Sequence, residues 1–320
     1  MGNETVKWIV FAALLIAAGL ILVGGVMLAV GWDVKQLSAV QYERNRYEID
    51  DRYRDIAIAS DTADIVFRPS KDGKTSIICY EQESAKHAVG VENGTLLIEL
   101  VDTRKWHERI ISFGKPAITV YLPTGDYARL SVKESTGNIE IPGGFSFESV
   151  EIEASTGDIT CSAFVSGCLK IKTSTGDISV RDISAGVLDL AVSTGKVSVS
   201  NVKCDGDVEV RVSTGKAQLS DLTCKSFVST GNTGDILFTN VIADGKLSVE
   251  RSTGDVRFNS ADAAELFIVT DTGDVKGTLL SEKVFITRSD TGRIDVPDSV
   301  SGGRCEITTD TGNIKIEIRR

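Results

Sequence analysis

Ten Thr-Gly dipeptides between residues 136 and 312 form a regular series, and no other feature constrains the fold as strongly. Consecutive copies are separated by 19 or 20 residues throughout. A period of this size, held to within one residue, is typical of a solenoid, in which each repeat packs only against its neighbours. The ten glycines are Gly137, Gly157, Gly176, Gly195, Gly215, Gly234, Gly254, Gly273, Gly292 and Gly312.

Each repeat contains three short apolar runs, which in one repeat include Ile178, Ile183 and Leu188. Apolar and polar residues alternate within the runs, and this pattern predicts half-buried strands. A single repeat cannot bury its own apolar side, so neighbouring repeats must stack at about 4.8 Å. We therefore predict an all-β fold in which residues 135–320 form a parallel, three-sided β-solenoid of about ten rungs. Right-handed coiling is expected because crossovers between parallel strands are right-handed.

The glycine corners have a structural interpretation. Glycine adopts backbone angles closed to other residues and allows a sharp turn into the next strand. The residue that follows the glycine is often acidic, and Asp235, Asp255 and Asp274 would stack as a line of like charges. We interpret this line as a solvated edge, because Lys196 and Lys216 interrupt the column. A ladder of bound cations at the three aspartates is the alternative.

The six cysteines contain no Cys-x-x-Cys spacing, so the pattern does not predict a metal site. Cys204 and Cys224 each lie nine residues after their glycines. They should therefore stack on consecutive rungs, with Cα atoms about 4.8 Å apart. Stacked side chains point in parallel, which favours two reduced, buried thiols over a disulfide.

Residues 8–30 form a run of 23 residues without a charge. As a helix this run would be about 34 Å long, enough to span a bilayer. We predict a single transmembrane helix that follows a short tail at residues 1–7. A cleaved signal peptide is the alternative, but its apolar core is usually only about 7–15 residues long. We expect the repeat domain to lie outside the cell membrane.

We assign residues 31–52 to a stalk and residues 53–134 to an amino-terminal β cap with degenerate rungs. Asp61-Thr62-Ala63-Asp64-Ile65 is a degenerate copy of the repeat corner, and Glu92-Asn93-Gly94-Thr95 predicts a hairpin turn. An atypical first unit of this kind would cover the open edge of the stack.

The chain lacks recognisable catalytic motifs. The two histidines, His87 and His107, both precede the repeats and lack the spacing of metal ligands. No nucleophile elbow or phosphate loop is present. We therefore predict no enzyme activity, no cofactor and no metal. The net charge of −10 argues against a nucleic-acid partner.

Several segments together resemble a known family. They are the Ser-Thr-Gly-Asp-Ile repeats, the preceding apolar helix, Ala63-Asp64-Ile65, Gly94-Thr95-Leu96, Lys105-Trp106 and Ile118-Thr119-Val120-Tyr121-Leu122-Pro123. This combination is similar to bacterial β-strand-repeat proteins labelled "putative adhesin" and domain of unknown function. The resemblance covers nearly the whole chain. It implies a β-solenoid in a cell-envelope setting, with no established enzyme activity.

The leading hypothesis is a membrane-anchored, non-enzymatic, adhesin-like protein that presents its solenoid surface to a protein or a cell-envelope polymer. The first alternative is a membrane-tethered scaffold, cytoplasmic or external, that polymerises end to end through the last rung, Thr311–Ile318. The second is a polysaccharide-cleaving β-helix enzyme. Such an enzyme needs paired carboxylates in a cleft built by longer loops, and repeats of 19 or 20 residues leave no material for one.

Overall fold

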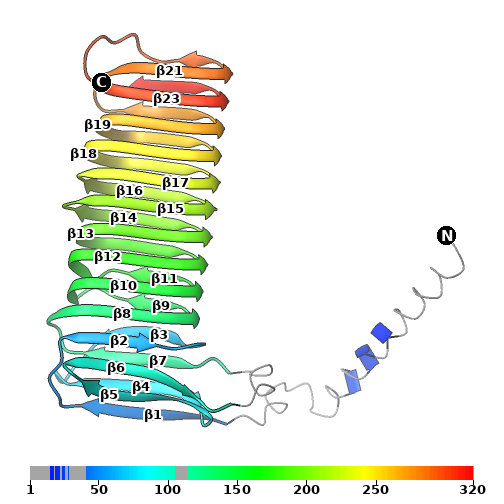
Figure 1. The fold of residues 1–320 in the computed structure, drawn as a ribbon, viewed down its shortest axis with the longest axis vertical. Coiled ribbons are helices and arrows are strands. Elements are labelled where there is room, and N and C mark those ends of the chain that lie inside the picture. The colour runs from blue at the N-terminus through cyan, green and yellow to red at the C-terminus, as the bar shows by residue number, and fades with distance from the viewer. Residues whose placement is uncertain are drawn as a thin grey trace, which may run out of the picture.

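The computed structural model describes an all-β column, apart from short helical pieces near the amino terminus (Figure 1). The 24 strands found in the described residues belong to one continuous hydrogen-bonded sheet. The predicted membrane segment 8–30 lies mostly outside the described residues, and no helix within them is long and apolar enough to cross a membrane. The described residues are 15–17, 19–21, 24, 25, 28, 41–104 and 114–319.

The cap at the base of the column is made of antiparallel strands, which distinguishes it from the coil. β4 (Thr75–Gln82) pairs with β1 (Tyr42–Ile49) on one side and with β7 (Ala117–Leu122) on the other. β5 (Ala85–Glu92) and β6 (Thr95–Asp102) form the predicted hairpin. Because β1 belongs to this sheet, the described part of the predicted stalk 31–52 is a strand of the cap.

The coil begins before the first Thr-Gly corner. β2 (Asp55–Ala59) and β3 (Asp64–Pro69) pair in parallel with β8 (Asp126–Thr136) and β9 (Ile139–Ile141). Ala63 occupies the corner position of this first rung, beneath Gly137. The degenerate Asp-Thr-Ala-Asp-Ile segment is therefore a genuine corner of the coil.

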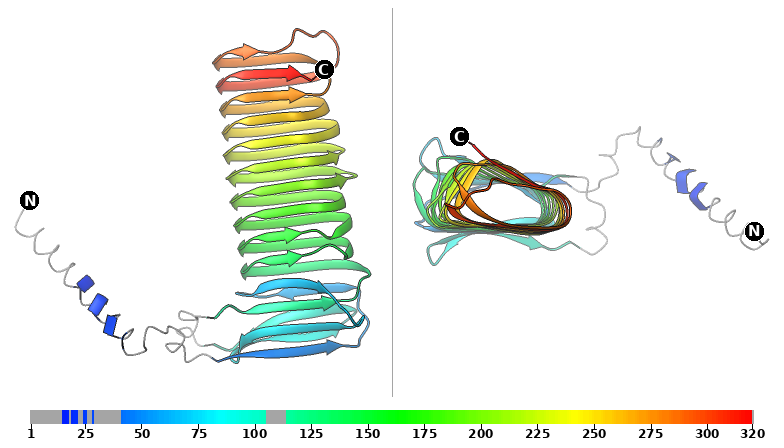
Figure 2. Two further views of the ribbon diagram at one scale, coloured as in Figure 1. Left: turned by 180° about the vertical axis from the view of Figure 1, so that it is seen from behind. Right: turned by 90° about the horizontal axis from the view of Figure 1, so that it is seen from above.

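Above β9 the rungs follow one another in chain order up to β20, each strand paired in parallel with its equivalent one rung away. Viewed along its axis, the coil is a flattened ring (Figure 2). The strands are β10 (Ser146–Thr156), β11 (Ile159–Cys161), β12 (Phe164–Thr175), β13 (Ile178–Thr194), β14 (Val197–Cys204), β15 (Asp207–Thr214), β16 (Ala217–Cys224), β17 (Ser226–Thr233), β18 (Ile236–Thr253), β19 (Val256–Thr272) and β20 (Val275–Leu279).

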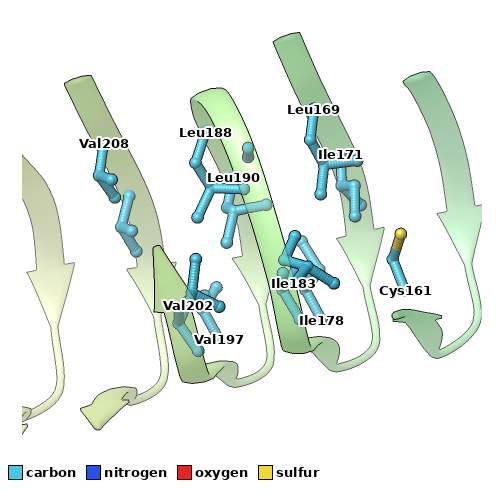
Figure 3. Close-up of a cluster of buried hydrophobic side chains, with 14 of the residues drawn as sticks. Cys161, Leu169, Ile171, Ile178, Ile183, Leu188, Leu190, Val197, Val202 and Val208 are labelled. Atoms are coloured by element: carbon cyan, nitrogen blue, oxygen red, sulfur yellow. The ribbon is translucent and has the colours of Figure 1, made fainter. Parts of the chain in front are cut away.

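The interior of the coil is a continuous apolar core (Figure 3). Leu169, Leu188 and Val208 occupy one inward column, and each is at most 1% exposed. Burying such a side chain contributes about 1.5–3 kcal/mol relative to leaving it in water. The β-solenoid predicted from the repeat is therefore present, and its stability comes from stacking equivalent residues on successive rungs.

The carboxyl-terminal end of the stack does not follow chain order. β23 (Gly303–Thr311) pairs with β19 on one side and with β21 (Lys283–Thr291) on the other. β24 (Ile314–Ile318) likewise lies between β20 and β22 (Ile294–Asp295). The expectation that Thr311–Ile318 forms the open end is wrong, because β21 and β22 end the stack (Figure 1).

Candidate functional site

The ten corner glycines share one contact. A β-carbon at any of them would lie 1.7–2.2 Å from the carbonyl oxygen of the equivalent corner residue on the adjacent rung. Gly234 also needs glycine because its φ is +124°, whereas Gly273 makes the same close approach without such an angle. The glycines are therefore structural, and close stacking requires them at these ten corners.

The aspartates after the glycines are engaged by neighbouring groups. Oδ1 of Asp235 accepts a hydrogen bond from the Asp255 amide at 3.1 Å, and Oδ1 of Asp255 accepts one from the Asp274 amide at 2.9 Å. Arg257 pairs with Asp255 at 2.7 Å, and Lys276 pairs with Asp274 at 3.3 Å. Protein donors thus already occupy the oxygens that a cation ladder would use, which favours the solvated edge.

A second polar ladder was not recognised in the sequence. Asp182, Asn201, Asp221 and Asn240 lie six residues after their glycines, and their φ angles are 51–56°. The Asn201 amide donates to Asp182 at 2.8 Å, and that of Asn240 donates to Asp221 at 3.0 Å. The recurrence of Asn and Asp at this position of the repeat could have indicated the ladder from the sequence, because these residues tolerate a left-handed backbone better than most others do.

Cys204 and Cys224 occupy equivalent positions on consecutive rungs, because Val202 and Lys203 pair with Leu222 and Thr223. All six cysteines are free thiols, and both members of this pair are buried. Burial raises the pKa of the Cys224 thiol to about 12, which makes it a poor nucleophile.

The cap contains a cluster of potential ligands that the sequence analysis missed. Cys79 and Glu81 face the same side of β4, and His87 comes from β5. The thiol, one carboxylate oxygen and one imidazole nitrogen all lie within 4.8 Å of one another. His87 Nδ1 lies 2.7 Å from Glu81 Oε2, and the Asn45 amide donates to Glu81 Oε1 at 2.8 Å. The sequence signal was the Cys-x-Glu spacing on a strand beside a histidine on the next one.

Ser60 and Glu134 extend this cluster into the coil. His87 Nε2 lies 3.1 Å from Ser60 Oγ. Ser60 and Glu134 each lie three residues before a corner, so they share one column on adjacent rungs. The Ser60 hydroxyl is close enough to lower the pKa of the Glu134 carboxyl, but burial dominates and raises that pKa to about 7. Glu134 Oε2 is buried and has no hydrogen-bond partner of normal geometry.

A patch of apolar and charged side chains lies on the outer face of β18, β19, β21 and β23 near the carboxyl-terminal end. We call Lys246, Phe267, Val269, Ile286 and Arg304 the distal patch. Lys246 Nζ lies 4.3 Å from the centre of the Phe267 ring, and Arg304 Cζ lies 5.5 Å from it. Val269 is 45% exposed and Ile286 is 49% exposed, so the patch presents apolar surface. Its charges are mixed, because Arg304 pairs with Glu306 and Lys246 is the register partner of Glu265.

The predicted family resemblance can be compared with known proteins. The sequence model of the Toastrack DUF4097 family matches residues 53–213 and 203–320. The chain belongs to this family. The Toastrack match covers both the cap, from residue 53 onward, and the repeats. It also confirms the predicted likeness to a domain of unknown function. No curated protein matches the chain.

Solved structures with detectable similarity to this Toastrack chain are distant. One named a putative adhesin, from Parabacteroides distasonis, is 13% identical, covers 75% of this chain and 97% of its own, and has a TM-score of 0.48. Another named a putative adhesin, from Bacteroides fragilis, is 15% identical with coverages of 87% and 97% and a TM-score of 0.41. A third, from P. distasonis and named a putative lipid binding protein, is 15% identical with coverages of 86% and 97% and a TM-score of 0.46.

Proposed function

We propose that this Toastrack protein is a non-enzymatic interaction protein of the cell envelope, tethered by residues 8–30 with its coil outside the membrane. Its coil acts as a rigid rod, and the distal patch binds an anionic polymer of the envelope. The apolar run at residues 8–30 supports the tether, and the near-constant rung length supports a rod without a catalytic cleft.

The observation that carries the binding proposal is Phe267 held between Lys246 and Arg304. Two cations, Lys246 and Arg304, lie here beside exposed apolar side chains, together with Glu265, the register partner of Lys246, and Glu306, which pairs with Arg304. Lys246, and Arg304 in exchange for its pairing with Glu306, offer charge to a polyanion, while Phe267 and Val269 offer apolar contact. The patch lies on a flat sheet face, which suits an extended polymer better than a small molecule in a concave pocket.

The binding proposal is tested with the full chain and two probes, dextran sulfate and neutral dextran. We expect binding to dextran sulfate that weakens with added salt, and none to neutral dextran. Phe267→Ala and Arg304→Ala should each weaken binding about tenfold, equivalent to about 1.4 kcal/mol. Val187→Ala removes exposed apolar surface elsewhere on the coil and is the matched control. Equal affinity of all variants would refute the patch, and binding only to an acidic protein would replace the polymer with a protein partner.

The tether is tested by adding protease to intact cells that produce the full chain. We expect the coil to be digested while a cytosolic marker survives, and deletion of residues 8–30 to release the coil from the membrane fraction. Protection of the coil until the membrane is broken would place it inside and would favour the scaffold function instead.

A scaffold that assembles end to end is the second candidate function, supported by the edge of β21. Among the described strands this one pairs with β23 alone, and Val284, Ile286 and Ile294 at the end of the stack are 37–49% exposed. An unpaired edge is a template for pairing with another chain. Sedimentation over a range of protein concentrations distinguishes the two functions, because a scaffold forms long assemblies and a rod does not.

A further inference from the structure

We infer that Cys79, Glu81 and His87 form a binding site for a divalent cation of the zinc class inside the cap. This site is separate from the distal patch and does not depend on the proposed function. Its three donors are a thiol, a carboxylate and an imidazole, which together suit Zn²⁺ better than Ca²⁺ or Mg²⁺. Three protein ligands leave a fourth tetrahedral position for water.

The backbone brings the three ligands together in one hairpin. Cys79 and Glu81 are two residues apart on β4, so both side chains point into the cap. The chain turns between Gln82 and Ala85 and returns His87 on β5. All three residues are at most 4% exposed. The site is therefore built from a short local segment, and little chain entropy is lost in closing it.

A second observation concerns the outer partners of the ligands. The Glu134 carboxyl, with its unpartnered Oε2, lies beside the Ser60 hydroxyl. Ionised Glu134 can only accept, so the Ser60 hydroxyl can donate to it and accept from His87 Nε2, 3.1 Å away. His87 then carries its proton on Nε2, and Nδ1 presents a lone pair to the cluster. A metal-binding histidine is commonly oriented through its other nitrogen in this way.

This arrangement leaves room for a cation between Nδ1 and Glu81. Glu81 Oε2 accepts a hydrogen bond from the His87 backbone amide at 2.7 Å, and with the imidazole proton on Nε2 its remaining lone pairs face the Nδ1 lone pair across 2.7 Å, which is repulsive unless a proton or a cation lies between them. Asn45 holds the other carboxylate oxygen of Glu81 and so directs Oε2 toward the cluster. A divalent cation bound by one thiolate and one carboxylate is also neutral overall, as a buried site requires.

The thiol must lose its proton when the cation binds. Burial, with a smaller contribution from Glu81, raises the pKa of Cys79 to about 12 in the absence of a cation. Coordination of Zn²⁺ by the sulfur replaces the S–H bond with a Zn–S bond and releases one proton to solvent. Binding should therefore tighten as pH rises.

The test uses the full chain at pH 8, freed of purification tags and stripped with a chelator, and titrated with Co²⁺ as a coloured substitute for Zn²⁺. We expect one equivalent to bind with a sulfur-to-cobalt charge-transfer band and tetrahedral visible bands, which Zn²⁺ then removes. Cys79→Ser should abolish the charge-transfer band. Cys305→Ser changes an equally buried cysteine outside the cluster and should leave the band intact. Absence of the band, or a band that persists in Cys79→Ser, would overturn the site.

Two further variants keep the test decisive if Cys79→Ser does not fold. Ser60→Ala leaves all three ligands in place but removes the partner of His87 Nε2, and it should weaken the affinity about tenfold. His87→Gln should weaken it further. Zn²⁺ should also raise the melting temperature of the parent chain by more than that of either variant. Equal stabilisation of all the chains would show that the ion binds elsewhere and would refute the proposal.

Discussion

Gly234 lies directly against Gly215 of the preceding rung, so that a β-carbon on Gly234 would be only 1.7 Å from the Gly215 carbonyl oxygen. The oxygen belongs to the backbone and cannot rotate away. The same approach recurs at every Thr-Gly corner, which explains why the repeat keeps glycine at this position even where the residue after it changes. Spacing between rungs thus depends on the absence of a side chain at the corner.

Substituting Gly234 should therefore destabilise the coil strongly. Gly234→Ala adds a backbone clash and also strains a φ of +124°. These two effects cost about 1–3 kcal/mol each, so the free energy of unfolding should fall by about 2–6 kcal/mol. Gly90→Ala is the control, because no atom lies within 4 Å of its added β-carbon. Chemical denaturation of both variants measures the difference, and similar stabilities would disprove the stacking argument.

The repeat and the alternation of apolar residues were sufficient to predict the coil, its approximate number of rungs and the corner at Ala63. These features are local and repeated, so each copy reinforces the same interpretation. The order of β21 and β23 could not be predicted this way. Both strands carry the Thr-Gly corner, and sequence periodicity does not say which of two similar strands lies inside the stack.

The cap cluster was missed for a different reason. Cys79, Glu81 and His87 are brought together by one hairpin, but Ser60 and Glu134 reach it only because β2 pairs with β8 across more than seventy residues of sequence. Ser60 and Glu134 also occupy a column that in other rungs contains Ala154 or Val192. A polar residue in that column is informative only once the register of the rungs is known.

Asp274 should make the coil sensitive to acid. The backbone amide of Asn313 hydrogen-bonds its carboxylate and, with Lys276, lowers the pKa below 3.8. A depressed pKa contributes stability that is present above the unfolded value and is lost as pH falls through the folded value. Asp274→Asn keeps an acceptor oxygen without the charge, so it should lose less stability below about pH 4 than the parent chain does. The measurement is the melting temperature of the parent chain and of Asp274→Asn as the pH is lowered. Asp298→Asn, in an exposed loop, is the control.

Glu134 should have the opposite effect. Burial raises the pKa of its carboxyl from 4.5 to about 7. Between these values the unfolded chain releases a proton that the folded chain keeps, so stability falls as pH rises from about 4.5 to 7 and is level above that. Glu134→Gln should remove this component. The free energy of unfolding, measured from about pH 4.5 to 7 for both chains, tests this direction. A parent chain that gains stability relative to Glu134→Gln as pH rises would contradict it.

The cysteines should differ sharply in reactivity. Cys168 is exposed, whereas the other five are buried thiols. A maleimide added to the folded chain should therefore modify one site, and after unfolding it should modify all six. Mass spectrometry gives the count, and Cys168→Ser should leave the folded chain unmodified. Rapid modification of Cys204 or Cys224 in the folded Cys168→Ser variant would show that the reagent reaches these two thiols and would contradict the prediction.

The position of β23 between β19 and β21 leads to a prediction about truncation. Within the described part of the chain β21 pairs with β23 alone, so a chain that ends at residue 302 keeps β21 but removes its partner. β21 is poorly suited to pack directly on β19, because Thr287 occupies the inward column in which β23 places the fully buried Ile307. A chain that ends at residue 282 removes both strands and leaves the rungs up to β20 stacked in order.

We therefore expect the longer truncation product to be no more stable than the shorter one, although it contains twenty more residues. Hydrogen exchange should show β21 (residues 283–291) protected in the full chain and exchanging like an unfolded segment in the chain that ends at residue 302. Protection of these residues in that chain would mean that β21 can replace β23 against β19. The order of the last two rungs would then not be determined by their inward side chains.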